Sequence, residues 1–217
     1  MIMTIPIPFE EFSIEQIEAF AENEFLIIDD FLPSEMAEKL LSELKFWRKE
    51  NKFKKGGIGK SVAHTVAEEI RRDEIKWIDK NSCLPHTAEY LLYLEKLSST
   101  LNRNFFLSLK DSEAMYAIYD KGAFYKTHRD RFKTQPHRVI SVVLYLNPKW
   151  KPEHGGELII HKEGKQKTDS IYIEPVYNRL ALFRSELLHE VVPCHKRRYS
   201  VTTWLKDQLN EVSFLSI

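Results

Sequence analysis

The spacing of apolar residues changes near Asn104, and this change constrains the fold more than any other feature of the sequence. Before Asn104, apolar side chains recur at the three- and four-residue intervals of amphipathic helices. After it, they form short runs separated by turn-forming Gly, Pro and Asn residues, which is typical of antiparallel strands. Helices followed by many strands predict an α+β protein with a jelly-roll, or double-stranded β-helix, core braced by N-terminal helices.

Three helices and one strand are predicted in the first half. Ser13 and Gln16 have the spacing of a capping box at the start of the first helix. Pro33 opens the second helix, the third runs from about Thr87, and the apolar run 25–28 reads as a buried strand between the first two. The strand-like runs of the second half are residues 113–119, 138–146, 157–161, 179–183 and 198–205.

Length and charge limit the domain count and the class of partner. A chain of 217 residues and 25.6 kDa favours a single domain over 1–217. Within it, residues 1–103 are expected to give mainly helical support with some strands, and residues 104–207 the β core. The 32 Lys and Arg residues balance the 32 Asp and Glu residues, so no net positive charge attracts nucleic acid and such a partner is not expected.

Cysteine content and apolar runs bear on the compartment. Cys83 and Cys194 are too few for a disulfide framework, which favours a reducing, cytoplasmic location. Residues 1–8 lack the basic start and the long apolar stretch of a targeting segment. The longest mainly apolar run, 139–146, is far shorter than a membrane span, so no membrane partner is expected.

The stretch 52–61 is basic and rich in glycine, and Gly59-Lys60-Ser61 invites comparison with a phosphate-binding loop. That motif needs a glycine at position 54, where this chain has Lys54. The stretch is therefore predicted to be a mobile surface loop rather than a nucleotide site.

Two histidines and one aspartate suggest a metal centre. In His128-Arg129-Asp130 the imidazole and the carboxylate are two residues apart, and on a strand they would share a face. With His189 as a third ligand, two His and one carboxylate leave three coordination sites open, as non-haem Fe(II) oxygenases require. About one such His-x-acid match is expected by chance. A second one, His161-Lys162-Glu163, is less convincing because Glu163 precedes a turn glycine.

A candidate anion site lies close to His189 in the sequence. Arg198 begins a predicted strand nine residues after His189. Alternation places Arg198, Ser200 and Thr202 on one face of that strand. Because a guanidinium stays protonated and forms two parallel bonds to a carboxylate, this face is suited to binding an anion.

Taken in order, these motifs are characteristic of one family. They are Tyr119, Tyr125, His128-Arg129-Asp130, Arg138, Tyr145-Leu146-Asn147, Gly155-Gly156, His189-Glu190-Val191, Arg198-Tyr199 and Trp204. The order resembles the 2-oxoglutarate- and Fe(II)-dependent prolyl 4-hydroxylase family, most of all the hypoxia-factor prolyl hydroxylases and their bacterial relatives. The resemblance covers about 24–207 and implies a cupin-like jelly-roll dioxygenase domain.

The resemblance also implies roles for individual residues. The implied catalytic residues are the iron ligands His128, Asp130 and His189, together with Arg198, which would pair with the distal carboxylate of 2-oxoglutarate. The other implied contacts to this co-substrate are Tyr145 at the same carboxylate, Tyr119 near the iron-chelating end, and the apolar Leu158 and Val191. Arg138 and Trp204 match positions that flank the target proline.

The implied reaction hydroxylates a prolyl residue of a protein and releases succinate and CO₂. It uses Fe(II), 2-oxoglutarate and O₂, with ascorbate as a further cofactor, and the protein substrates implied by analogy are transcription factors and components of translation. The stretch 52–70 corresponds in order to a loop that closes over substrate, but its sequence departs from the animal enzymes, so substrate identity stays open. Two alternatives remain: a nucleic-acid demethylase of the same superfamily, and a non-catalytic β-barrel that binds a carboxylate ligand or a partner protein.

Overall fold

The computed structural model describes residues 11–57, 68–161 and 170–209 of the chain. Its helices are α1 (Ile14–Asn23), α2 (Ser34–Lys49) and α3 (Pro85–Phe105), and a 3₁₀ helix spans Pro152–His154. Its strands are β1 (Phe25–Ile28), β2 (Lys54–Lys55), β3 (Glu74–Trp77), β4 (Asp111–Tyr119), β5 (Tyr125–His128), β6 (Arg138–Tyr145), β7 (Leu158–Ile160), β8 (Ile171–Ile173), β9 (Leu180–Arg184), β10 (His189–Val191) and β11 (Arg198–Lys206). None of the described helices is both long and apolar enough to cross a membrane.

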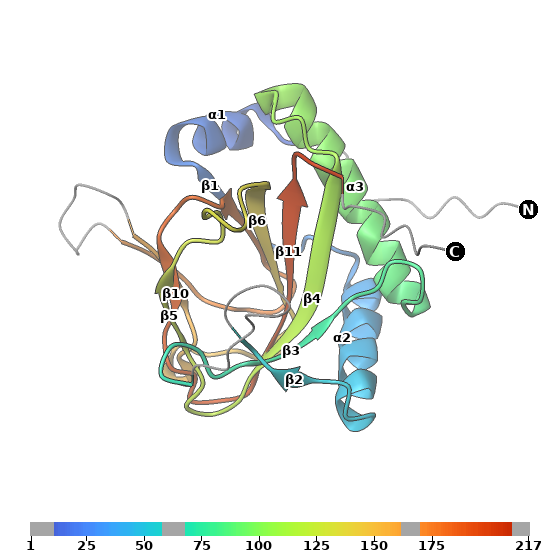
Figure 1. Ribbon diagram of the computed structural model, residues 1–217, viewed down its shortest axis with the longest axis vertical. Coiled ribbons are helices and arrows are strands. Elements are labelled where there is room, and N and C mark those ends of the chain that lie inside the picture. The colour runs from blue at the N-terminus through green and yellow to red at the C-terminus, as the bar shows by residue number, and fades with distance from the viewer. Residues whose placement is uncertain (1–10, 58–67, 162–169, 210–217) are drawn as a thin grey trace, which may run out of the picture.

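The strands form two antiparallel sheets. The larger sheet has the order β1-β9-β6-β11-β4-β3-β2, and the smaller has the order β5-β10-β7-β8. Helices α2 and α3 lie on one side of the larger sheet, and strands β5 and β10 of the smaller sheet lie on the other (Figure 1). This arrangement is the predicted α+β jelly-roll with supporting helices.

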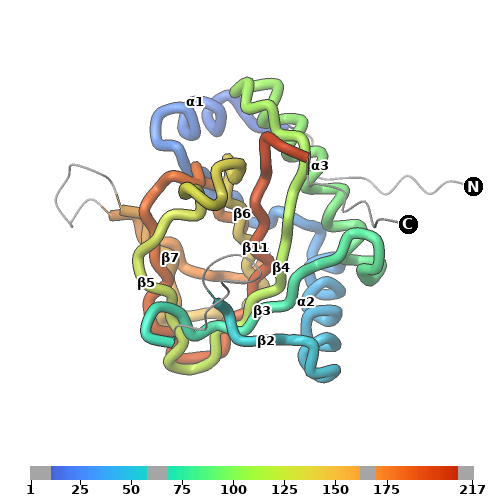
Figure 2. Tube along the Cα trace, viewed as in Figure 1, coloured from blue at the N-terminus to red at the C-terminus, as the bar shows by residue number. Residues whose placement is uncertain are grey.

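The sheets join segments that are far apart in the sequence. Phe25 of β1 pairs with Phe183 of β9, and β11 runs between β4 and β6 (Figure 2). Strands β1, β2 and β3 of the first half therefore belong to the same sheet as the long strands of the second half. Pairing between segments that are distant in the sequence therefore joins both halves of the chain in one sheet.

Strand β6 is buried on both faces, and its side chains alternate between two cores. Val142 and Leu144 belong to the core shared with the helices. Val143 and Tyr145 belong to a second core between the sheets. Because successive side chains of a strand point to opposite faces, one strand supports the helical layer and also forms a wall of the space between the sheets.

The predicted helices are present, and their ends have clear causes. Ser13 and Gln16 form the predicted capping box of α1. Helix α3 begins at Pro85, two residues before the predicted start. Its first turn is capped from α2, because the buried Glu43 carboxylate accepts the backbone N–H groups of His86 at 2.9 Å and Thr87 at 2.8 Å.

The structure also contains elements that sequence patterns did not predict. Strands β3, β8 and β10 have four, three and three residues, which is too short for a periodic signal. The predicted surface loop 52–61 instead contains the short strand β2. Gly59, Lys60 and Ser61 of that stretch lie outside the described residues.

Candidate metal centre and its cavity

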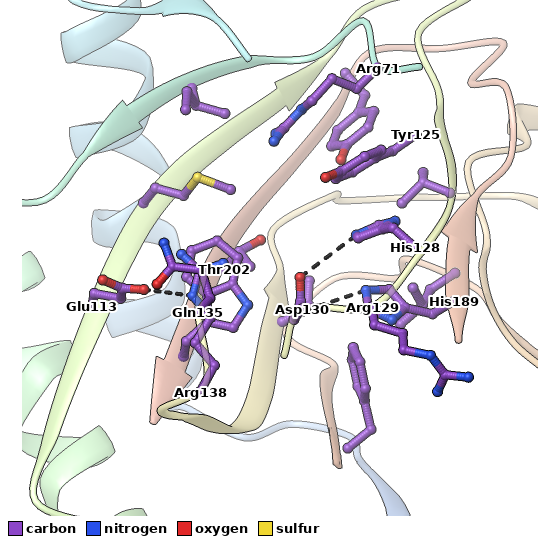
Figure 3. Close-up of a pocket in the computed structure, with 18 of the residues that line it drawn as sticks. Arg71, Glu113, Tyr125, His128, Arg129, Asp130, Gln135, Arg138, His189 and Thr202 are labelled. Atoms are coloured by element: carbon purple, nitrogen blue, oxygen red, sulfur yellow. Dashed lines mark hydrogen bonds and ion pairs between the residues drawn. The ribbon is translucent and has the colours of Figure 1, made fainter. Parts of the chain in front are cut away.

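A cavity of about 840 Å³ lies between the two sheets. Strands β4, β6 and β11 of the larger sheet supply one wall, and β5, β7 and β10 of the smaller sheet supply the other. Figure 3 shows side chains from both walls converging on this space. A cleft with polar groups at defined points of an otherwise apolar wall is the usual form of a binding site.

The predicted ligands His128, Asp130 and His189 meet in this cavity. His128 of β5 pairs in register with His189 of β10. The Asp130 carboxylate lies between the rings, 3.6 Å from His128 Nε2 and 3.4 Å from His189 Nε2. The three ligand atoms lie within 4.8 Å of one another, and among the described residues this is the one group of three His, Cys, Asp or Glu side chains able to hold a metal ion.

Hydrogen bonds set the tautomer of both imidazoles. His128 Nδ1 lies 2.8 Å from the carbonyl of Lys126, and His189 Nδ1 lies 2.9 Å from the carbonyl of Leu187. A carbonyl only accepts, so each Nδ1 carries a proton, and in the neutral ring each Nε2 presents a lone pair to the centre. Burial lowers the pKa of His128, which favours this neutral ligand form. For His189 burial acts in the same direction, but the neighbouring Asp130 outweighs it and raises the pKa.

The position of Asp130 differs from the prediction. Strand β5 ends at His128, so Asp130 is not on the strand and does not share its face by alternation. Its backbone N–H instead donates to the carbonyl of Ser185 at 3.1 Å, which turns the chain toward the centre. The Ser141 hydroxyl donates to Asp130 Oδ2 at 2.7 Å and lies 2.9 Å from the Ser185 hydroxyl.

Asp130 is held as a carboxylate despite its burial. Burial alone would raise its pKa, but His189 and His128 hold that pKa well below the ordinary value. With Ser141 bonded to Oδ2, Oδ1 faces His128 and Oδ2 faces His189. An ionised carboxylate with two neutral imidazoles fits a divalent metal of the first transition series.

Arg198 lies at the other end of the cavity and is almost fully buried, with 2% of its surface exposed. No acidic side chain of the described residues pairs with it, and its Nη1 lies 3.4 Å from the Ser200 hydroxyl. The Tyr119 and Tyr145 rings each lie 4.8 Å from the guanidinium carbon. Tyr145 is fully buried beside Arg198 rather than on the cavity surface.

Two buried polar groups at this end lack partners within the described chain. They are Nε of Arg198 and the hydroxyl of Tyr145. Burial raises the pKa of Tyr145, so its phenol keeps the proton it could donate. A buried cation without a counter-charge is costly. These residues therefore fit a bound carboxylate, which would satisfy both groups, and the donor set at the opposite end fits Fe(II).

The alternation predicted for the last strand is present. The side chains of Arg198, Thr202 and Trp204 all line the cavity, so one face of β11 spans it from the buried arginine to the mouth. Leu158 and Val191 lie opposite each other on β7 and β10 and line the apolar side.

The mouth holds Arg138 and Trp204, together with two residues that the sequence analysis did not assign. The Arg138 guanidinium carbon lies 3.6 Å from the centre of the Trp204 ring, and its Nε donates to Glu113 at 2.6 Å. Trp77 of β3 is 50% exposed, and the centroid of its ring lies 5.8 Å from that of the Trp204 ring. Glu113 pairs with Trp204 in the β4–β11 register, so alternation along both strands was the signal that could have found it.

His161, the one described ligand candidate of the rival metal motif, does not reach the metal centre. His161 lies outside the cavity, with Nε2 3.2 Å from Glu190 and Nδ1 3.1 Å from Ser170. Its partner in the motif, Glu163, lies outside the described residues. The three ligand atoms that do converge are those of His128, Asp130 and His189.

Comparison with known proteins gives consistent similarities. Residues 114–206 match the sequence profile of the 2OG-Fe(II) oxygenase superfamily. Prolyl hydroxylase EGLN3 of Mus musculus is 30% identical over 192 residues, which cover 84% of this chain and 78% of that protein. The matched profile includes all three converging ligands and Arg198.

Two solved structures have the same fold as this chain. A prolyl-4-hydroxylase of Pseudomonas putida superposes with a TM-score of 0.78 at 31% identity, covering 90% of this chain and 98% of that one. A prolyl hydroxylase from Trichoplax adhaerens, in complex with a peptide fragment of a hypoxia inducible factor oxygen degradation domain, superposes with a TM-score of 0.77 at 28% identity. That match covers 88% of this chain and 87% of the other.

Proposed function

We propose, since this chain belongs to the prolyl hydroxylases of the 2OG-Fe(II) oxygenase superfamily, that it hydroxylates a prolyl residue of a protein substrate. The reaction uses Fe(II), 2-oxoglutarate and O₂ and releases succinate and CO₂. One observation carries the proposal: a two-histidine, one-aspartate cluster and an arginine without a counter-ion lie at opposite ends of one cavity. A dicarboxylate that chelates a metal through one end needs a metal centre at that end and a cation at the other.

His128, Asp130 and His189 would hold the iron. Three protein ligands leave room for a chelating co-substrate and for O₂, and the iron with 2-oxoglutarate supplies the oxidising chemistry when bound. The chain contributes orientation: Lys126 and Leu187 fix the imidazole tautomers, and Ser141 fixes the carboxylate.

Arg198 and Tyr145 would hold the remote carboxylate of 2-oxoglutarate. The guanidinium offers a two-pronged contact and the phenol a third donor. Tyr119, stacked over the same guanidinium, would lie along the chain of the co-substrate toward the metal, and Leu158 and Val191 would exclude water from its apolar side.

Arg138 and Trp204 would hold the substrate at the mouth. The Trp204 ring offers a flat apolar surface for a pyrrolidine ring, and Arg138 offers donors for a peptide carbonyl. Glu113 holds Arg138 by its Nε, so the terminal nitrogens would remain for contacts with the substrate. The half-exposed Trp77 extends this aromatic surface.

Several finer points rest on the sequence and on the family rather than on the site. We assign residues 1–217 to a single dioxygenase domain that acts in the cytoplasm. Its substrate would be a transcription factor or a component of the translation machinery, with no nucleic acid or membrane partner. Ascorbate would support turnover by keeping the iron reduced.

The first test is conversion of 2-oxoglutarate to succinate by protein loaded with Fe(II) without oxygen and then exposed to air. Wild type should form succinate without substrate at a slow rate, and His189→Ala should not. A proline-containing protein substrate should accelerate turnover and gain about 16 Da on proline, the mass of one oxygen.

Three results would count against the proposal. Oxygen found on lysine, arginine or a free small molecule would remove the prolyl assignment. Methylated oligonucleotides as the only effective substrates would favour a demethylase. Absence of Fe(II) and 2-oxoglutarate binding in calorimetry would favour a non-catalytic barrel.

A further inference from the structure

Three side chains form a continuous stack that ends at the metal centre. The Tyr125 ring lies flat against the His128 imidazole, with centroids 3.6 Å apart and planes inclined by 17°. The Arg71 guanidinium carbon lies 4.4 Å from the Tyr125 ring centre. Figure 3 shows the three side chains in this order, Arg71 farthest from Asp130. The imidazole is therefore packed by a ring that is itself packed by a cation.

Arg71 is fixed in place by a buried ion pair. Its Nε donates to Asp73 Oδ1 at 2.6 Å, a second bond joins Nη2 to Oδ2, and Nη1 donates to the carbonyl of Gly57 at 3.3 Å. The side chains are 7% and 0% exposed. A Cβ at Gly56 would lie 2.5 Å from Asp73 Oδ1 and 2.6 Å from Arg71 Nε, so only glycine leaves room for the pair.

The strand that carries His128 has little support of its own. β5 has four residues and lies at the edge of the smaller sheet, with β10 as its one neighbour there. On its other side the chain at 70–72 covers it: Lys126 N–H donates to the Ile70 carbonyl at 2.9 Å, and Arg72 N–H donates to the Phe124 carbonyl at 3.0 Å. The direction of the His128 ring therefore depends on the segment that also carries Arg71.

A buried ion pair adds little to the free energy of unfolding. Desolvation of both charges offsets most of their attraction, and an apolar pair of similar volume packs as well. What Arg71 and Asp73 supply instead is geometry, because a two-pronged pair fixes the plane of the guanidinium. That plane lies over Tyr125.

We propose that Arg71 is a positioning residue for the metal centre, which holds Tyr125 against His128 and so fixes the direction of His128 Nε2. The inference rests on the proposed function only in requiring that His128, Asp130 and His189 bind a divalent metal. Groups that orient a ligand without touching the metal typically change metal affinity by about 10- to 100-fold when removed.

The neighbouring arginine offers a matched control. Arg72 makes the same kind of contact, with its guanidinium carbon 5.1 Å from the centre of the Phe124 ring, and donates from Nε to the Glu68 carbonyl at 2.9 Å. It does not line the cavity. Arg71→Leu and Arg72→Leu thus remove the same charge and the same kind of stacking contact. Only Arg71 contacts the ring that packs against the ligand His128.

The experiment is titration calorimetry of metal-free protein with Mn(II), together with visible spectra of the Co(II)-loaded forms. Arg71→Leu should bind Mn(II) about 10-fold more weakly or worse and show a changed Co(II) spectrum, whereas Arg72→Leu should match wild type within about twofold. Tyr125→Phe keeps the ring stack and should retain affinity, while Tyr125→Leu should lose it to the same extent as Arg71→Leu. This pair decides the question if Arg71→Leu does not fold.

The outcomes separate this inference from the proposed function. Unchanged Mn(II) affinity and an unchanged Co(II) spectrum in folded Arg71→Leu, or equal affinity in Tyr125→Phe and Tyr125→Leu, would overturn the positioning role. Failure of wild type itself to bind Mn(II) would overturn the proposed metal centre. Equal losses in Arg71→Leu and Arg72→Leu would mean a general effect of charge, and the positioning role would again be wrong.

Discussion

The two ends of the cavity are built in different ways. Arg198, Tyr119 and Tyr145 lie on β11, β4 and β6, which have nine, nine and eight residues and are paired on both sides within the larger sheet. His128 and His189 lie on β5 and β10, which have four and three residues. Strand pairing in the larger sheet fixes the residues of the anion end. At the metal end the ligands are fixed instead by contacts with the Ser141 and Tyr125 side chains and with two backbone carbonyls.

The two ends also differ in charge. At the metal end an ionised Asp130 lies between two imidazoles that are neutral when they bind metal. At the other end Arg198 has no counter-ion among the described residues. Each end presents the charge opposite to that of the group it is proposed to hold, which orients a metal-bound dicarboxylate in one direction.

Removing Asp130 should have the largest effect, because it is the one carboxylate in the metal-binding group of the described residues. We expect Asp130→Ala to lower succinate formation by at least about 10³-fold, as when one member of a unit that acts together is lost. Asp120→Ala is the control, since Asp120 is a surface carboxylate bonded to Arg197. Turnover within tenfold of wild type in Asp130→Ala would show that the metal lies elsewhere.

Arg198→Met should affect function and stability in opposite directions. Loss of a buried charged contact to a carboxylate costs about 2–5 kcal/mol, so the KM for 2-oxoglutarate should rise about 30-fold or more. Without ligand, the variant should unfold at the same or a higher temperature, because an unpaired buried cation is removed.

Arg197→Met is the matched control for that experiment, since Arg197 lies at the surface and pairs with Asp120. It should leave the KM for 2-oxoglutarate unchanged. With metal already at saturation, added 2-oxoglutarate should raise the melting temperature of wild type and Arg197→Met further but not that of Arg198→Met. A large stabilisation of Arg198→Met by 2-oxoglutarate would place the carboxylate elsewhere.

Ser141→Ala tests whether the metal end depends on side-chain contacts. The variant loses the hydrogen bond to Asp130 Oδ2 and should bind Mn(II) about 10-fold more weakly, with little change in the KM for 2-oxoglutarate. Ser99→Ala, whose hydroxyl bonds within helix α3, should leave both unchanged. Equal metal affinity in Ser141→Ala and wild type would show that backbone geometry alone positions Asp130.

The smallest effect is expected from pH at Cys194, whose thiol lies beside Gly156 at the anion end, as the Arg198 side chain does. Burial raises the pKa of the Cys194 thiol to about 11 from an ordinary value of 9. A raised folded-state pKa stabilises the fold below the unfolded-state value, and this contribution is lost as pH rises from 9 through 11. At pH 10 the loss should be about 1 kcal/mol. Urea unfolding of wild type and Cys194→Ala measures this loss. If the difference between their free energies of unfolding stays constant between pH 8 and 10, the raised pKa of Cys194 is wrong.

Local patterns were sufficient for much of the site. Alternation along residues 198–204 placed Arg198 and Thr202 on one face, and both line the cavity. The spacing of His128, Asp130 and His189 suggested a donor set, and the structure brings these three together. Alternation succeeds because it relates residues near one another in the chain, and the donor set could be found because ligand chemistry depends on residue type.

The tertiary structure alone decided the supporting contacts. Asp130 reaches the centre from a bend after β5, because Ser185 and Ser141, distant in sequence, bind it. Trp77 enters the mouth because the four-residue β3 joins the larger sheet beside β4. Arg71 reaches Tyr125 because the chain at 70–72 covers the edge of β5. Contacts between remote segments depend on sheet order and register, which a local pattern of polar and apolar residues does not encode.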